Sequence, residues 1–260
     1  MKTSKSSSFW KNIRILFLLI ILLIVAVNAW RDQNQNWERP IVVLLHPVNA
    51  DGQATTEQYI QHLTTEAFAS SQQFLQDSST LYRGKKVYFI YQLGRELKQL
   101  PPKIPENASA LQVMLWSLKF RYYAWQQHTS QDGRPTVTLY LNYYDPEQTT
   151  ALKHSTALEK GRIAMVNLFA SGQQAAQNNI VLTHELLHAF GATDKYELAS
   201  GQPIYPSGYA NPEQQPRYPQ HQAEIMGGYI ALSATTSKMP ESLAQVTLNK
   251  PTAIEVGWIK

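Results

Sequence analysis

The sequence of 260 residues predicts a single α/β (α+β) domain behind an N-terminal membrane segment. Two observations support this fold class. Short apolar runs alternate with stretches of helical periodicity from residue 41 onward, and an unbroken apolar run precedes them. Hydrophobic residues make up 43% of the chain, enough for a sizeable core. We therefore expect a membrane segment over 1–30, a linker over 31–40 and the domain over 41–260.

The apolar run of the membrane segment is Ile15–Val27, which is 13 residues long. Positive residues stay on the cytoplasmic side, so the chain after residue 30 is expected outside the cytoplasm. The run is short for a span, and Val27-Asn28-Ala29 resembles a signal-peptide cleavage site. Trp30 suits the membrane interface and favours an uncleaved signal-anchor, so both a membrane-anchored and a secreted protein remain open. The basic residues that precede the run are Lys2, Lys5, Lys11 and Arg14.

These four basic residues account for the net charge of +4. The rest of the chain has 19 basic and 19 acidic side chains, which argues against a nucleic-acid partner. The chain has no cysteine, which excludes disulfides, thiolate zinc sites and cysteine catalysis.

The alternation predicts four strands, at 41–45, 86–91, 137–143 and 163–169. Two helices fall between them. Thr55 and Gln58 resemble a capping box that opens a helix to about Gln76. Ser109 and Gln112 form a second possible capping box, for a helix to about His128. One face of that helix is marked by Leu111, Leu115, Leu118, Tyr122 and Trp125.

The C-terminal third is predicted to be less regular. Residues 199–222 are rich in Pro, Tyr, Gln and Gly, and a loop of this length suggests a ligand-covering role. Residues 240–260 are expected to form one or two short helices that pack on the sheet. Ile254, Val256 and Trp258 are the expected docking residues.

Residues 184–194, HELLHAFGATD, indicate the chemistry. His184 and His188 are four apart, so on a helix both imidazoles can reach one zinc ion at about 2.0–2.1 Å. Glu185 lies beside the first ligand, where a carboxylate can take a proton from the attacking water and later deliver it to a leaving amine. Gly191 is suited to end the helix, and the turn can bring Asp194 back as a third ligand.

This stretch resembles the zinc-binding signature of the metzincin proteases, whose usual third ligand is a histidine at the position of Asp194. An aspartate there resembles the snapalysin-type variant. Glu224-Ile225-Met226-Gly227-Gly228 is similar to the family's methionine turn, with Met226 as its methionine. The resemblance implies a zincin domain whose mixed twisted sheet contains a central zinc-binding helix. It also implies Zn²⁺ on His184, His188 and Asp194, and an extended substrate paired with the edge strand, here 163–169.

Other roles remain open for several of these residues. Asp194 could bond nearby backbone or pair with Lys195, in which case Glu224 is the rival third ligand. Met226 could simply fill the core. Tyr229 could approach the metal or a substrate oxyanion, and His221 is a weaker candidate for a substrate contact. The histidines without ligand spacing are His46, His62, His128 and His154.

The sequence therefore predicts a zinc-dependent endopeptidase that acts on a peptide or protein substrate outside the cytoplasm, with the membrane contacted through its N-terminal segment. Two alternatives stay open: a hydrolase of another envelope amide bond, and a non-catalytic envelope protein that keeps the fold for binding. An intact Glu185 disfavours the second, because a binding protein needs no general base.

Overall fold

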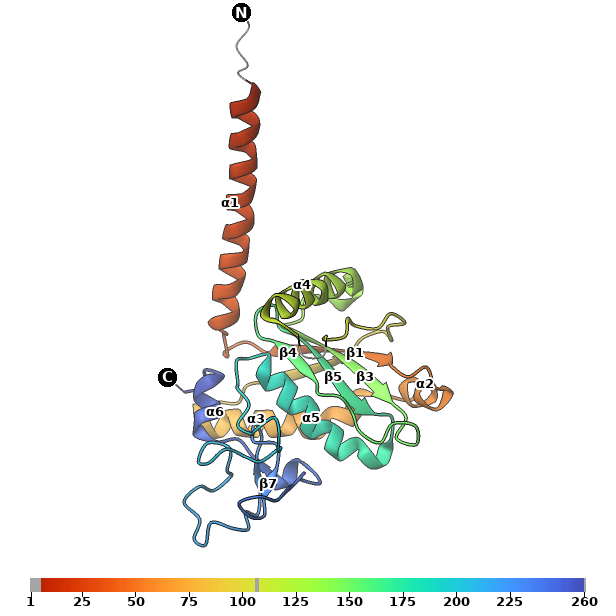
Figure 1. Cartoon of the computed structure of the whole chain (residues 1–260), viewed down its shortest axis with the longest axis vertical. Helices are drawn as coiled ribbons and strands as arrows, with labels where there is room; N and C mark the ends of the chain where they lie inside the picture. The colour runs from red at the N-terminus through yellow and green to blue at the C-terminus, as the bar shows by residue number, and fades with distance from the viewer. Residues whose placement is uncertain (1–5, 106–107, 260) are drawn as a thin grey trace, which may run out of the picture.

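The computed structural model describes residues 6–105 and 108–259. A five-stranded sheet in the order β2-β1-β3-β5-β4 has helices on both faces (Figure 1). Four strands are parallel, and β4 alone runs antiparallel to its neighbour β5. The predicted α/β class with a mixed sheet is therefore confirmed. The strands are β1 (Ile41–Asn49), β2 (Phe89–Leu93), β3 (Val137–Tyr144), β4 (Thr156–Leu158) and β5 (Ile163–Phe169).

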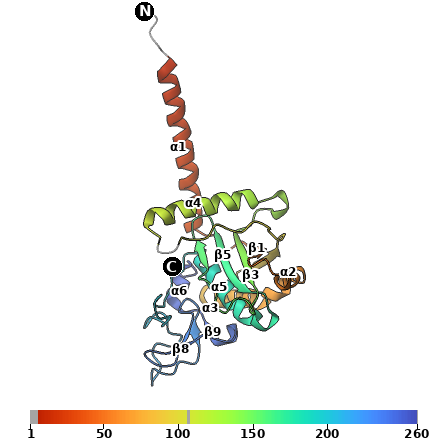
Figure 2. The ribbon, with the colours of Figure 1, turned by 45° about the vertical axis from the view of Figure 1, so that its right-hand side comes forward.

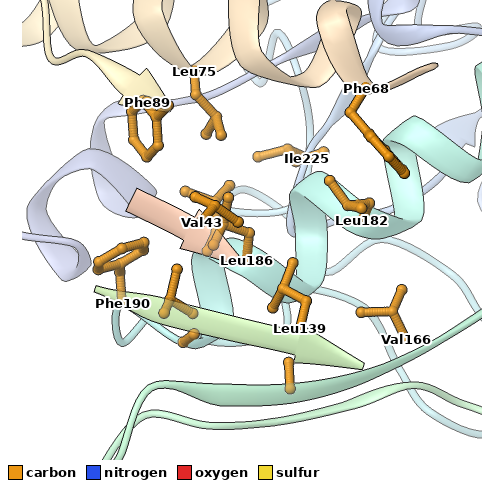
Figure 3. Packing of buried hydrophobic residues seen from close by; sticks show 14 of the residues in the cluster. Val43, Phe68, Leu75, Phe89, Leu139, Val166, Leu182, Leu186, Phe190 and Ile225 are labelled. Atoms are coloured by element: carbon orange, nitrogen blue, oxygen red, sulfur yellow. The ribbon is translucent and has the colours of Figure 1, made fainter. Parts of the chain in front are cut away.

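One face of the sheet packs on α3 (Ala69–Arg83) and α5 (Ala175–His188), and these contacts form the main core. Figure 3 shows how strand residues such as Val43 and Leu139 meet Leu75, Leu182 and Leu186 from the helices. All five side chains are completely removed from water. Helix α5 is therefore central, as its nearly continuous apolar surface predicts.

The opposite face of the sheet is covered by α4 (Ala110–Gln127). Ser109 accepts from the backbone of Gln112, whose side chain reaches back to the backbone of Ser109, so this predicted capping box is confirmed. The helix packs Trp116, Phe120 and Tyr123 against the sheet. The stripe marked in the sequence by Leu111, Leu115, Leu118, Tyr122 and Trp125 faces outward instead.

The predicted helix from Thr55 to Gln76 begins within one residue of its predicted start, but its capping box and its continuity are wrong. The chain forms α2 (Ala54–Gln61), a 3₁₀ turn (Thr65–Phe68) and then α3. The N-cap of α2 is Gln53, which makes no side-chain cap, and Thr55 lies inside the helix, where its hydroxyl donates to the Asp145 carboxylate. The second predicted strand is confirmed as β2, which begins three residues later than predicted and pairs with β1.

The N-terminal helix α1 (Ser6–Gln33) projects away from the domain (Figure 1). Its segment Phe9–Asp32 is 24 residues long and contains an 18-residue stretch with a mean hydropathy of 2.6, so it is long and apolar enough to cross a membrane. Lys2 and Lys5, on which the predicted topology partly rests, lie outside the described residues. The predicted linker 31–40 contains one core residue, Trp37, which is buried.

The C-terminal region is irregular, as predicted. The long loop 199–222 leads to two small two-stranded sheets, β6 with β9 and β7 with β8. Helix α6 (Lys250–Glu255) packs beside α3. Val256 and Trp258 are buried as predicted, but Ile254 is exposed because it lies on the outer side of this short helix. The short strands are β6 (Ala223–Glu224), β7 (Ile230–Ala231), β8 (Ser237–Lys238) and β9 (Val246–Thr247).

Trp37 fastens the end of α1 to the domain. Its ring lies 4.9 Å from that of Phe190 and 5.8 Å from that of Trp258, measured between centroids. We predict that Trp37→Ala lowers the free energy of unfolding by about 3–5 kcal/mol, because a large buried side chain is lost. Denaturant unfolding of the full chain in detergent measures this. The exposed neighbour Arg39→Ala is the control and should change it by less than about 0.5 kcal/mol. Equal effects of the two substitutions would contradict the docking of Trp37.

Candidate metal centre

Helix α5 and the turn after it position the candidate ligands. His184, Glu185 and His188 lie in its last turns, where the other faces are buried in the core. Gly191 has a φ of +98°, a conformation that other residues rarely adopt. The turn is closed by a hydrogen bond of 3.1 Å from the Ala192 amide to the Leu187 carbonyl. The chain is thereby directed back under the helix.

Three electron-pair donors converge at this point. Nε2 of His184 and Nε2 of His188 lie 3.0 Å apart, and Asp194 Oδ1 lies 3.1 Å and 3.0 Å from them. Nδ1 of His184 lies 2.9 Å from the Ile225 carbonyl, and Nδ1 of His188 lies 2.7 Å from the Ala192 carbonyl. A carbonyl oxygen only accepts, so each Nδ1 holds a proton. A neutral ring then presents a lone pair at Nε2, whereas a protonated ring donates from Nε2 to Asp194. With both rings neutral, three lone pairs converge here on a position that suits a metal cation.

The separations suit zinc. Ligands at about 2.0–2.1 Å from a tetrahedral ion are about 3.3–3.4 Å apart, only slightly more than the distances between these donors. Two imidazoles and one carboxylate are a ligand set of catalytic zinc sites. Donor atoms of His184, Glu185 and His188 also lie within 4.8 Å of one another, but the Asp194 oxygen is closer to both imidazoles. Asp194 therefore fits the third position better than Glu185.

Hydrogen bonds of Thr193 and Lys195, the two sequence neighbours of Asp194, hold this segment in place. Lys195 Nζ donates to Glu255 Oε2 at 2.6 Å, and the Thr193 amide donates to the same carboxylate oxygen at 3.0 Å. The Lys195 amide donates to the Met226 carbonyl at 2.9 Å. The alternative of an Asp194–Lys195 pair does not occur, because Lys195 is turned to Glu255. Asp194 is left to face the two histidines.

Burial and neighbouring charge shift the pKa values of the site. Burial alone would raise the pKa of Asp194, but hydrogen bonds from His184 and His188 hold it well below its usual range. Burial opposes protonation of His184, yet the Asp194 hydrogen bond and the nearby Glu185 charge raise its pKa. Burial raises the pKa of Glu185, the dominant effect on that carboxyl. Glu185 Oε2 has no hydrogen-bond partner among the described residues.

Both carboxylate oxygens of Glu224 accept hydrogen bonds that hold the turn containing Met226. Its Oε2 accepts from the backbone of Met226 at 2.6 Å and of Gly227 at 2.9 Å, and its Oε1 accepts from the Thr252 hydroxyl at 2.7 Å. Both Glu224 and Met226 are fully buried. The structure thus gives Glu224 a structural position in the turn, and Ile225 presents its carbonyl to His184 from the same turn.

Two cavities of about 640 and 260 Å³ meet at the site. Glu185, His154 and Tyr196 line both of them, and Tyr229 lines the larger. Sequence reasoning missed Tyr196 and His154 because neither has a recognisable spacing to the ligands. His221 is exposed and lines neither cavity.

The Tyr196 ring lies 6.2 Å from that of His184 and 6.4 Å from that of Tyr229, between centroids. Burial, together with the charges of Asp194 and Glu185, raises the pKa of Tyr196 to about 12. The tyrosine is therefore protonated at neutral pH and offers a hydroxyl donor at the cleft.

The predicted edge strand 163–169 is wrong in its position. Strand β5 pairs with β3 on one side and with β4 on the other, so β4 is the edge of the sheet. Thr156 and Ala157 of β4 line the smaller cavity. The strand that can receive an extended ligand beside the candidate metal site is thus β4.

Comparisons with known proteins find likeness to solved structures but none to known sequences. No family model matches the chain, and no curated protein matches it. The fold is similar to a zinc-dependent peptidase from Methanocorpusculum labreanum, with a TM-score of 0.35 and 11% sequence identity. That match covers 83% of this chain and 100% of the other.

The two acidic candidates for the third ligand can be separated by substitution. We predict that Asp194→Ala lowers zinc affinity by more than about 10²-fold, because it removes a direct ligand. Loss of a group that only hydrogen-bonds a ligand usually costs about 10–100-fold. Glu224→Ala should instead lower the free energy of unfolding by about 2–4 kcal/mol, since several buried donors lose their acceptor. Calorimetric zinc titration and denaturant unfolding measure these effects. Loss of zinc from the Glu224 variant alone would reverse the assignment.

Proposed function

We propose that this chain is a zinc-dependent endopeptidase of metzincin-like type, held at a membrane by α1 with its domain outside the cytoplasm. The observation that supports it best is the convergence of His184, His188 and Asp194 beside the unpaired carboxylate of Glu185. A cation site next to a buried general base at the junction of two cavities is the arrangement that metal-assisted hydrolysis needs. The four basic residues before the apolar run support the orientation.

The ligands would be His184, His188 and Asp194. Zinc held there would polarise the scissile carbonyl and lower the pKa of a bound water enough to supply hydroxide at neutral pH. The carbonyl oxygens of Ile225 and Ala192 hold the two imidazole rings in the tautomer that leaves Nε2 free.

Glu185 moves the proton. Its Oε2 is buried and unpaired, and its raised pKa keeps the carboxylate basic enough to accept a proton from the attacking water. The oxygen of that water forms the new bond to the substrate carbon. When the carbon–nitrogen bond breaks, Glu185 gives the same proton to the leaving amine, and the carboxylate is restored.

The substrate would lie extended along β4. This strand is paired only with β5 in the described part of the sheet, so its outer edge can add an antiparallel peptide strand by main-chain hydrogen bonds. The cavities on the two sides of Glu185 would receive side chains from either side of the scissile bond. The larger one is lined by Phe169 and Met239, among others, and suits an apolar side chain.

Zinc analysis and peptide cleavage by the full chain test the proposal together. One zinc per chain and chelator-sensitive cleavage of a broad peptide mixture are expected. A folded protein that refuses zinc would remove the basis of the proposal. Bound zinc without peptide cleavage would favour a different envelope amide substrate or a binding role.

The role of Glu185 is tested by Glu185→Gln. We predict that turnover falls by about 10²–10⁴-fold, because the amide cannot accept the proton. Zinc content and unfolding should stay unchanged, since Glu185 is not assigned as a ligand. Near-normal activity would contradict the base assignment, and loss of zinc would make Glu185 a ligand.

Tyr196 is proposed to donate its hydroxyl hydrogen bond to the substrate oxygen as negative charge develops there. We predict that Tyr196→Phe lowers kcat by about 10²-fold with little change in KM, as for the loss of one oxyanion donor. Tyr229→Phe is the matched control, because Tyr229 lines the larger cavity but not the smaller one. Steady-state kinetics on one peptide measures both variants. A larger fall in kcat for Tyr229→Phe than for Tyr196→Phe would assign the hydrogen bond to the substrate oxygen to Tyr229 instead.

A further inference from the structure

The outward face of α4 is an apolar stripe without a partner in the described chain. Its six side chains are between 48% and 72% exposed, whereas the opposite side of the helix is buried on the sheet. No charged residue interrupts it. The outer stripe of α4 consists of Leu111, Met114, Leu115, Leu118, Tyr122 and Trp125.

The spacing makes this stripe a continuous surface. The six positions fall within an arc of about 100° when successive residues are 100° apart around the helix axis. Lys119 and Arg121 flank the stripe on its two sides. Helix α4 is therefore apolar on two opposite sides, and only one of them can pack on the sheet.

The end of α1 is fastened next to α4. Asp32, in the last turn of α1, accepts a 2.8 Å hydrogen bond from the Gly161 amide through Oδ2. Arg121 of α4 donates to the Lys160 carbonyl at 2.5 Å. Both helices are thus tied to the same turn between β4 and β5. Figures 1 and 2 show α4 on the side of the domain from which α1 projects, lying across its direction.

We propose that the outer stripe of α4 lies in the interfacial layer of the bilayer that α1 spans, as a second membrane contact. This inference rests on the membrane-anchoring part of the proposed function. A helix that lies across the direction of a spanning helix, at the point where that helix leaves the membrane, is parallel to the bilayer surface. Its apolar face is then turned to the lipid.

The side chains on α4 suit this environment. Tyr122 and Trp125 have stacked rings with centroids 5.7 Å apart, and such rings are enriched at the interface between lipid and water. Lys119 is exposed and can extend from its flank to lipid headgroups while its methylene groups cover apolar surface.

The second contact fixes how the domain meets the membrane. Helix α5 packs on the other face of the sheet, so the sheet separates the candidate metal centre from the lipid. The cleft then opens to water near the membrane. Extended segments of proteins at the membrane surface are the substrates that this placement favours, in preference to segments inside the lipid.

Fluorescence quenching by spin-labelled lipids tests the proposal. The chain has no cysteine, so Leu118→Cys and Trp125→Cys each give a single labelling site on the full chain in lipid nanodiscs. Ser70→Cys, exposed on α3 at the opposite face of the sheet, is the matched control. Lipids with a nitroxide near the headgroup should cause a large loss of fluorescence at 118 and 125 and little loss at 70.

The experiment distinguishes failure of the α4 contact from failure of the α1 anchor and of the peptidase proposal. Leu19→Cys in α1 should be quenched by a nitroxide deep in the acyl chain. Quenching at 19 but not at 118 and 125 would overturn the α4 contact and leave the anchor in place. Labels at 118 and 125 that are shielded from a water-soluble quencher, yet not quenched by lipid, would assign the stripe to a second copy or another protein and overturn the proposal. None of these readouts requires zinc or peptidase activity.

Discussion

The close approach of His184 Nε2, His188 Nε2 and Asp194 Oδ1 is the interaction on which the arrangement of the domain depends. Three lone pairs about 3 Å apart repel one another unless a cation lies between them, so the surrounding fold must hold them there. It does so from separate parts of the chain. Helix α5 supplies the histidines, the turn at Ile225 orients one ring, and Glu255 of α6 holds the Asp194 segment through Lys195.

The parts of the site that are local in sequence could be predicted. Two histidines one helical turn apart, the adjacent Glu185 and the offset of Asp194 from Gly191 are fixed by helix and turn geometry alone. The Lys195–Glu255 pair joins residues far apart in the chain, and only the folded chain brings them together. His154 and Tyr196 reach the cleft from loops, where no periodicity indicates the direction of a side chain.

In the fold, too, local features could be predicted from the sequence, whereas contacts between distant segments could not. The capping box at Ser109 is a local signal and was predicted correctly, whereas Thr55 has the same pattern but bonds Asp145, which lies on a distant segment. Strand β4 has three residues, too few for a visible alternation, and without β4 the sequence places the sheet edge at β5. Helix α4 has apolar residues on two sides, and periodicity cannot tell which side packs on the sheet.

Helix α1 and the candidate metal centre meet at one cluster. Trp37 packs on Phe190, and the guanidinium of Arg162 lies 4.4 Å from the centre of the same Phe190 ring. Arg162 also donates to the Asp32 carbonyl at the end of α1. Phe190 belongs to the turn whose Ala192 carbonyl fixes the His188 ring. The same packing therefore joins the domain to α1 and supports the turn that orients His188, a candidate ligand. A change at that junction can reach His188 through the backbone between Phe190 and Ala192.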